Sequence, residues 1–499
     1  MNNDNPSPRR TPNIWQAMAP VCFLIGMLSS SVYLFGDQSS SGPNQIALIF
    51  GSGFCLVIGF FNGHPWKDLE AGISRGLSVS MGAILILLVV GSVIGTWILA
   101  GVVPTMIYYG LSILSPSLFY AAACLICAVV ATATGSSWTT AGTIGIALIG
   151  IATTQSLHMG LAAGAVISGA YFGDKMSPLS DTTNLAPAVA GTDLVVHIRH
   201  MVWTTAPSFA AALILFLAAG FFTPIPDDTT KLDSVLGVLE TQFVIGPHLL
   251  IPVIVVLALV IRRVPAFPAL LIGTLLGGVF AVVFQRTAVL TFIGASDLPE
   301  WVSLIKGVWV SMYGGFELQS GNSTLDELLS RGGMASMLMT VWLIMTAMIF
   351  GAVMETTGLL QVIATRILKA VRGPGSLISA TLGTSFGMNV LAADQYIAIV
   401  LPGRMFRGEY RRQRLDPKNL SRTLEDAGTL TSALVPWNTC GAFMAQTLGV
   451  STLTYAPFAF FNILTPLVAA AYGFTGISIQ KLEESETEGG RGHDVHTVS

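Results

Sequence analysis

The sequence is poor in charge. Only 10% of its 499 residues are Asp, Glu, Lys or Arg, whereas 52% are apolar, and soluble domains carry about 25% charged residues. The mean hydropathy is +0.70, and apolar runs of about 20 residues recur along the chain. This composition excludes an ordinary soluble domain and predicts an all-α polytopic membrane protein with the lipid bilayer as its surroundings. The net charge of -3 gives no sign of a nucleic-acid partner.

Two other features are scarce or missing. The five cysteines lie in or beside apolar runs, which favours packing roles over a disulfide framework. Cys124 and Cys127 form a CxxC, but within an apolar segment helix packing is favoured over redox chemistry. No lysine follows a glycine, so the Gly-Lys-Ser/Thr phosphate loop is missing and ATP bound to this chain is not the energy source. Coupling to an ion gradient remains as the energy source. The sequence predicts no enzyme activity and no cofactor.

The two halves of the chain resemble each other. The segment ISRGLSVSM from Ile73 matches LSRGGMASM from Leu329 at five of nine positions, 256 residues apart. Asp174 has a counterpart in Asp426, 252 residues away, and the Gly/Ser/Thr-rich stretch at 134–142 is echoed at 383–389. Because the first half holds five predicted spans, an odd number, the second copy is predicted to be inverted in the membrane.

These patterns predict about ten transmembrane helices in two inverted repeats, with two re-entrant hairpins and two broken helices. The repeats are residues 1–223 and 244–477, joined by a connector at 224–243 and followed by a flexible cytoplasmic tail at 478–499. The spans of the first repeat are 14–35, 45–61, 81–113, the broken segment 159–190 and 201–223, and the hairpins are 117–156 and 375–402. Most of the 24 Lys and Arg then lie on the side of the N-terminus, so the positive-inside rule places both termini in the cytoplasm.

One polar stretch, GAYFGDKMSPLSDTTNLA at 169–186, interrupts the apolar runs. A carboxylate at mid-bilayer costs about 3 kcal/mol, so such residues are usually functional. Pro178 removes a backbone donor and pushes Ser177 out of helical angles, which predicts a break that Ser180 or Asp181 caps. Broken backbone is tolerated at this depth only around a protein-lined or wet cavity. The stretch therefore predicts a binding site.

A second polar set lies in the other half, where Pro436 predicts another break. Both sets offer hard oxygen ligands, which suit Na+ better than a soft metal. The candidate ion- and proton-binding residues are Asp174, Ser177, Asp181, Thr182, Thr183, Asn184, Asn389, Asp394, Asp426, Thr429, Asn438 and Thr439. Na+ itself is assigned to Asp174, Asp181, Asn184, Asp426 and Asn438, and the hairpin tips to Gly135, Ser136, Ser137, Thr384 and Ser385. The alternative for each residue is a structural contact, such as an ion pair between Asp174 and Lys175 or Ser/Thr packing between helices.

A carboxylate that holds either Na+ or a proton, but never both, is sufficient for exchange. Bound Na+ favours the charged form of an acid such as Asp174, and after release the loss of solvation favours the protonated form. Together with broken helices that allow alternating access, this predicts a secondary antiporter.

The stretch FGDKMSPLSDTTNLAPAVAGTDLVVHIRHM at 172–201 resembles the signature of the NhaC family of Na+/H+ antiporters. IGTWILAGVVPTMIYYGL at 94–111, TGSSWTTAGTIG at 134–145 and NVLAADQYIAIVLPGRMF at 389–406 look like further family blocks. The resemblance implies a bacterial inner-membrane antiporter that forms a homodimer, with a scaffold domain and a transport domain that moves like an elevator.

Relatives with this signature also exchange organic acids, such as malate against lactate. An organic-acid antiporter coupled to Na+ and H+ is therefore the alternative. A buried cation near the hairpin tips, Lys175 or an arginine, favours that alternative, whereas a cavity lined only by acids favours Na+.

Overall fold

The computed structural model describes residues 10–222, 229–294 and 298–482. Within these ranges the chain is helical, and its β structure is limited to two isolated bridges. The predicted all-α polytopic class is therefore confirmed. Seven described helices are long and apolar enough to cross a membrane, or nine if two bent helix pairs each count as one span. The predicted total of about ten stays a prediction.

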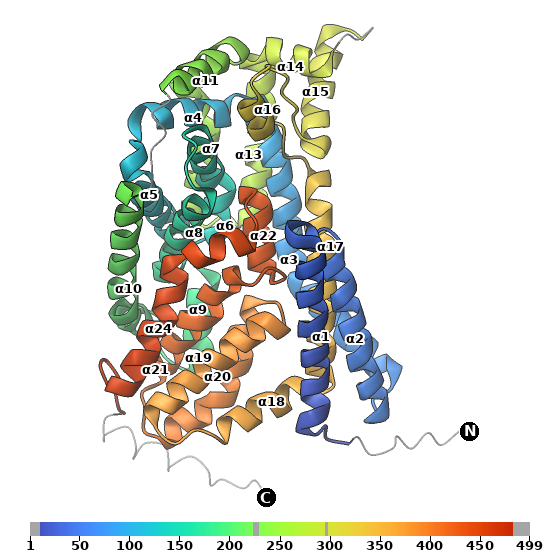
Figure 1. Cartoon of the computed structure of the whole chain (residues 1–499), viewed down its shortest axis with the longest axis vertical. Helices are drawn as coiled ribbons and strands as arrows, with labels where there is room; N and C mark the ends of the chain where they lie inside the picture. Colours follow the sequence, from blue (N-terminus) through green and yellow to red (C-terminus); the bar gives the residue numbers. More distant parts are fainter. Residues whose placement is uncertain (1–9, 223–228, 295–297, 483–499) are drawn as a thin grey trace, which may run out of the picture.

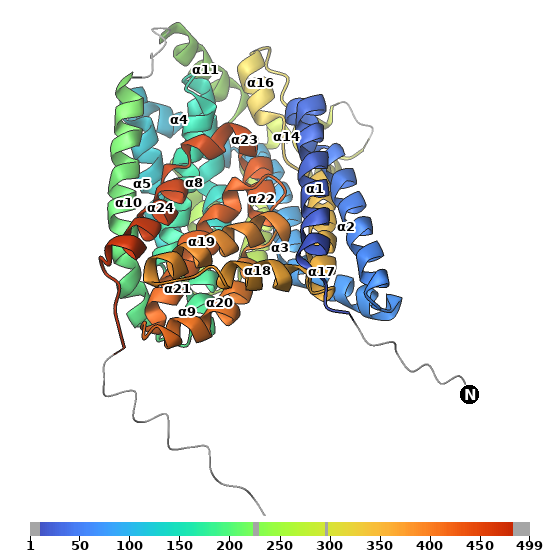
Figure 2. The ribbon, with the colours of Figure 1, turned by 60° about the horizontal axis from the view of Figure 1, so that its bottom comes forward.

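The helices form two groups that lie side by side (Figures 1 and 2). One group is built on α3, a helix of 34 residues that packs against α13, α15 and α17. Its members are α1 (Ile14–Phe35), α2 (Pro43–Phe61), α3 (Trp66–Leu99), α12 (Ile251–Ile261), α13 (Ala266–Phe284), α15 (Glu300–Gly314) and α17 (Leu338–Thr356). The other group includes α10 (Leu194–Phe222) and α24 (Phe460–Thr475) and carries the hairpins and interrupted helices described below.

Shorter helices connect these groups or cover their ends. They are α4 (Val102–Ile113), α11 (Thr229–Gln242), α14 (Arg286–Ile293), α16 (Ser323–Leu329), α18 (Leu359–Leu368) and α23 (Thr452–Tyr455). The single span predicted at 81–113 is wrong, because α3 ends at Leu99 and α4 starts at Val102. Gly101 between them has a φ of +73°, a left-handed conformation that only glycine adopts at little cost. An uninterrupted apolar pattern gives no sign of this turn.

The first hairpin reverses at a glycine. Helix α5 (Phe119–Thr134) ends at Gly135, and the returning arm consists of α6 (Ser137–Thr140), a π-helical turn at 141–145 and α7 (Ile146–Thr154). The Ser136 hydroxyl caps α6 by accepting a hydrogen bond from the N–H of Thr139. The predicted tip at Gly135, Ser136 and Ser137 therefore coincides with a turn in the structure.

The second hairpin reverses later than predicted. Helix α19 (Pro374–Leu391) passes through Thr384 and Ser385 without interruption, and the turn to α20 (Gln395–Arg412) lies at 392–394. The tip assignment of Thr384 and Ser385 is wrong, because glycine, serine and threonine do not force a helix to end. The Thr384 hydroxyl donates to the carbonyl of Ala380 in its own helix, at 2.7 Å.

Both predicted helix breaks are present. Helix α8 (Met159–Met176) gives way to extended backbone at Ser177, and Ser180 caps α9 (Asp181–Ala190). In the second half α21 (Pro417–Leu424) continues through a π-helical turn at 425–429 and a 3-10 turn at 430–434. The chain is extended at Val435, and Asn438 caps α22 (Thr439–Leu448).

The residues that cap the helices after the turns and breaks recur at one distance along the sequence. Ser136 and Asp394 cap the returning arms of the two hairpins, and Ser180 and Asn438 cap the helices after the two breaks. Each pair is 258 residues apart. At this spacing Ser432 is opposite Asp174, and the equivalence of Asp174 and Asp426 at 252 residues stays a prediction. The π-helical and 3-10 turns at 425–434 correspond, at the 258-residue spacing, to a regular part of α8.

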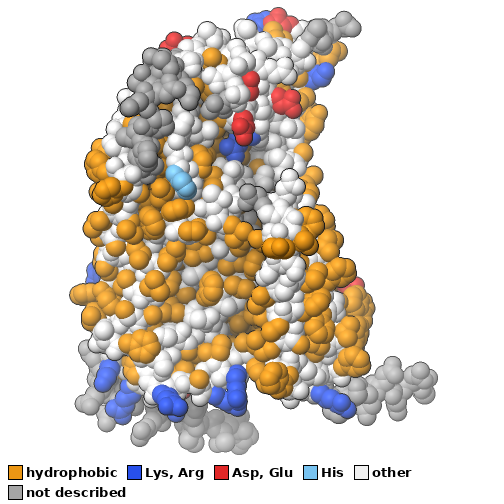
Figure 3. Space-filling view, in the orientation of Figure 1, with side chains coloured by type: hydrophobic (Ala, Val, Ile, Leu, Met, Phe, Trp, Pro, Cys, Tyr) orange, Lys and Arg blue, Asp and Glu red, His pale blue; other side chains and the backbone are white. Residues whose placement is uncertain are grey.

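The surface is divided along the long axis of the molecule. Apolar side chains cover its middle, and Lys and Arg gather at the end where α20 and α21 lie (Figure 3). The start of α1 is at this same end (Figure 1). Residues 478–482 also lie here and are not a free tail, since the N–H of Asp416 donates to the carbonyl of Gln480 at 3.0 Å. The rest of the predicted tail, 483–499, and the start of the predicted connector lie outside the described residues.

Candidate functional site

The first hairpin tip binds the end of α8. The Asp174 carboxylate oxygen Oδ2 accepts hydrogen bonds from the Ser137 N–H at 3.1 Å and from the Ser137 hydroxyl at 2.6 Å. The Thr183 hydroxyl donates to the carbonyl oxygens of Asp174 and Lys175 in the last turn of α8, and the Asp174 carbonyl also accepts from the N–H of Ser177. Asp174 is therefore held by donors from the tip, and the freed backbone of α8 is satisfied by α9.

Replacing Ser137 by alanine is expected to lower the free energy of unfolding by about 1.5–3 kcal/mol, because a charged acceptor loses one hydrogen bond. Thermal unfolding of purified protein measures this change. Thr132→Ala is the matched control, since its hydroxyl bonds only to the carbonyl of Ala128 in its own helix. Equal unfolding temperatures for the two variants would contradict the contact between Ser137 and Asp174.

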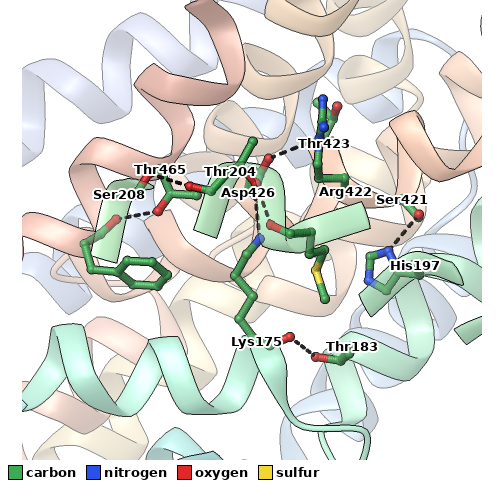
Figure 4. Close-up of polar contacts among 12 residues, drawn as sticks. Lys175, Thr183, His197, Thr204, Ser208, Ser421, Arg422, Thr423, Asp426 and Thr465 are labelled. Atoms are coloured by element: carbon green, nitrogen blue, oxygen red, sulfur yellow. Dashed lines mark hydrogen bonds and ion pairs between the residues drawn. The ribbon is translucent and has the colours of Figure 1, made fainter. Parts of the chain in front are cut away.

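The central contact joins the two halves of the chain. The Lys175 ammonium, at the end of α8, lies 2.5 Å from Oδ1 of Asp426 on the π-helical turn, and both side chains are fully buried. The Thr204 hydroxyl of α10 donates to the same oxygen at 3.0 Å. Figure 4 shows Lys175 and Thr204 meeting Asp426 from different helices. Arg422, one turn before Asp426, has its Nε 3.9 Å from Oδ2 and donates from Nη1 to the Ser478 hydroxyl at 2.7 Å.

Two asparagines tie the second hairpin to the second break. The Asn389 amide donates to the carbonyl of Gly428 at 2.7 Å and to the Thr431 hydroxyl at 2.9 Å. The Asn438 amide donates to the side-chain oxygen of Asn389 at 3.1 Å. The N–H of Thr439, at the start of α22, donates to the carbonyl of Ala393 in the hairpin turn at 3.0 Å. The second hairpin and break therefore form one hydrogen-bonded unit.

The predicted site residues separate into buried and exposed sets. Asp181 and Asn184 are exposed on α9, and the Asn184 amide donates to the carbonyls of Pro178 and Ser180. Asp394 is buried and caps α20 through the N–H groups of Tyr396 and Ile397. The other predicted ion- and proton-binding residues are also buried: Asp174, Ser177, Thr182, Thr183, Asn389, Asp426, Thr429, Asn438 and Thr439.

Sequence reasoning missed part of the charged network. The structural alternative paired Lys175 with its neighbour Asp174, whereas the ion pair runs to Asp426. Arg422 and Glu425 are fully buried beside Asp426 but were not on the candidate list. The spacing of Arg422 and Asp426, four residues apart on a helix, is the local signal that pointed to their proximity.

Comparison with known proteins agrees with this geometry. The model of a family described as the Na+/H+ antiporter family matches residues 169–477, which include both interrupted helices and the second hairpin. The chain belongs to the NhaC family of Na+/H+ antiporters. It is 42% identical over 431 residues to the Na+/H+ antiporter NhaC of Alkalihalophilus pseudofirmus, an alignment that covers 86% of this chain and 90% of the relative.

Other relatives of this NhaC-family chain carry different names. It is 37% identical to the malate-2H+/Na+-lactate antiporter of Bacillus subtilis, across 94% of this chain and 96% of the relative. It is 36% identical to the arginine/ornithine antiporter ArcD of Halobacterium salinarum, across 96% of each chain. All three relatives are named as antiporters, and two of the names include Na+.

Proposed function

We propose that this protein exchanges Na+ for H+ across the cytoplasmic membrane of a bacterium by alternating access. One observation carries the proposal: the buried carboxylate of Asp426, on the second interrupted helix, is bound to Lys175 at the end of the first, and buried carboxylate, hydroxyl and amide side chains of both breaks surround this link. Carboxylate, hydroxyl and carbonyl oxygens are the ligands that hard cations prefer. Membership of the Na+/H+ antiporter family and the name of the 42% identical relative support the same function.

The arrangement proposed for this function has two inverted repeats, 1–223 and 244–477, about ten spans, two re-entrant hairpins and two broken helices. The 258-residue spacing of the caps supports a duplication. Lys and Arg at the end that holds α20 and α21 (Figure 3) support a cytoplasmic location for that end and for both termini. A homodimer, with the hairpin group moving like an elevator against the group around α3, completes the proposal.

Exchange follows from competition for buried acids. A buried carboxylate is costly when it is ionised and unpaired, so it holds either a cation or a proton. Na+ entering the cluster around Asp426 displaces a proton, and the reverse occurs when the cluster faces the other side of the membrane. Na+ and H+ are the transported substrates, and the residues of the two breaks supply the ligands.

Exchange of organic acids is the second candidate, because one relative is named a malate-2H+/Na+-lactate antiporter. Lys175 is a buried cation near the first hairpin tip, as that candidate requires. However, the Asp426 carboxylate neutralises Lys175 at 2.5 Å, so its charge is not free for a substrate carboxylate. The geometry therefore favours Na+/H+ exchange.

Purified protein in liposomes with a trapped pH-sensitive dye tests the proposal. Gradients of Na+, Li+ and K+ are imposed in turn, with and without malate or lactate. We expect an Na+ gradient alone to move protons, and Asp426→Asn to abolish this movement. Proton movement that requires malate or lactate would replace the proposal by the organic-acid candidate, and no proton movement under any condition would refute both.

A further inference from the structure

We infer that Glu425 carries the exchanged proton, and that its deprotonated carboxylate binds Na+ together with the Thr429 hydroxyl. The inference rests on the proposed Na+/H+ exchange and names the groups that perform it. Glu425 is fully buried, and neither of its carboxylate oxygens has a hydrogen-bond partner. An ionised carboxylate without donors is strongly disfavoured in such surroundings, so Glu425 is neutral until a cation replaces its proton.

Three other buried acids in this region already accept hydrogen bonds. Asp174 accepts two hydrogen bonds from Ser137, and Asp394 accepts two from backbone N–H groups of α20. Asp426 accepts from Lys175 and Thr204 through Oδ1. These donors stabilise the charged forms of the three acids. Glu425 differs from them because neither of its carboxylate oxygens accepts a hydrogen bond.

Four of the buried oxygens that have no hydrogen-bond partner lie on one turn. They are both carboxylate oxygens of Glu425, Oδ2 of Asp426 and the hydroxyl of Thr429, and they belong to the π-helical segment 425–429. A π-helical turn is a rare distortion that is often found at functional sites. Glu425 and Thr429 are four residues apart and face each other, so this carboxylate and this hydroxyl offer hard oxygen ligands to one cation.

The neighbours of Glu425 fit this role. Lys175 and Asp174, both at the end of α8, are charged groups near enough to act on Glu425, and the buried Arg422 and Asp426 lie on the same helical segment. The hydroxyls of Thr182 from α9 and Thr429 from its own turn face it without hydrogen-bond geometry. Lys175 is bound to Asp426 and supplies no hydrogen bond to Glu425. The site therefore has elements of both interrupted helices around the proton-carrying group.

The exchange is balanced in charge. With the proton on Glu425, the Lys175–Asp426 pair is neutral and Glu425 adds no charge to the site. When Na+ binds, the proton leaves Glu425 for water, and the positive charge of Na+ replaces the charge that departs. The buried region thus holds the same net charge in both loaded states, which limits the desolvation cost of either.

The experiment compares Glu425→Gln with the wild type in detergent, without any membrane. Glutamine has the shape of the protonated acid but cannot lose a proton. Addition of NaCl to weakly buffered wild-type protein is expected to release about one proton per Na+ bound. The Glu425→Gln variant is expected to release none, and to bind Na+ roughly tenfold or more weakly, with an affinity that no longer depends on pH. Glu355→Gln, at an exposed position on α17, is the matched control and is expected to behave as the wild type.

A second variant and the liposome assay distinguish a failure of the Glu425 assignment from a failure of the proposed function. Glu425→Asp retains a carboxyl group, so it is expected to release protons on Na+ binding with reduced affinity, which a purely structural role for Glu425 does not predict. Proton release by Glu425→Gln with an unchanged pH profile would overturn the assignment while Na+/H+ exchange stands. If the wild type itself releases no proton and drives none in liposomes, the proposed function and this assignment are both wrong.

Discussion

Replacing Lys175 by methionine is expected to destabilise the protein by about 3–5 kcal/mol and to abolish exchange, because the change leaves Asp426 buried without its cation. The ammonium lies 2.5 Å from the carboxylate, and both side chains are fully buried. The Thr204 hydroxyl remains as a donor, but it brings no positive charge. Thermal unfolding in detergent measures the stability, and the liposome assay measures exchange.

A double variant separates charge from packing. Lys175→Met combined with Asp426→Asn removes both members of the pair, so most of the lost stability is expected to return while exchange stays absent. Lys306→Met, at an exposed lysine on α15, is the control for the loss of a lysine as such. If Lys175→Met unfolds at the wild-type temperature, the ion pair does not exist in the folded protein.

Both helix breaks were predictable because proline acts locally. Pro178 has no N–H and restricts the residue before it, and the structure has extended backbone at Ser177 and a cap at Ser180. The same reasoning places the second break near Pro436, where Asn438 caps the next helix. Asn389 and Asn438, both on the candidate list, are joined by a hydrogen bond of 3.1 Å, which the sequence alone did not predict.

Other features depend on contacts that no local pattern encodes. The second hairpin turns at Ala393, whose φ is +55°, and an alanine gives no sign of a left-handed turn. The adjacent Asp174 seemed the natural partner of Lys175, but helical geometry directs neighbouring side chains apart and sends Lys175 to Asp426 instead. Glu425 is distinguished by the absence of donors around it, which is a property of the packed structure.

The packing of α5 against α8 sets the geometry of the first half of the site. A Cβ atom added to Gly169 of α8 would lie 2.0 Å from the carbonyl oxygen of Cys124 in α5, and one added to Gly173 would lie 2.4 Å from the N–H nitrogen of Thr132. Small residues four apart allow such close contact between helix backbones. Because α5 leads to Ser137 and the last turn of α8 carries Asp174, this contact positions the hydrogen-bonded pair.

Replacing Gly169 by leucine is therefore expected to separate the two helices and to cost more than the 1–3 kcal/mol typical of an overfilled core, about 4 kcal/mol or greater. Folded protein is expected to be scarce, and any that is recovered should lack exchange, since Ser137 then moves away from Asp174.

Gly383→Leu is the matched control, because an added Cβ there meets nothing within 4 Å. Its unfolding temperature and exchange rate should equal those of the wild type. Normal stability of the Gly169→Leu variant would mean that α5 and α8 are not in backbone contact. The contact between α5 and α8 would then not be what positions Ser137 against Asp174.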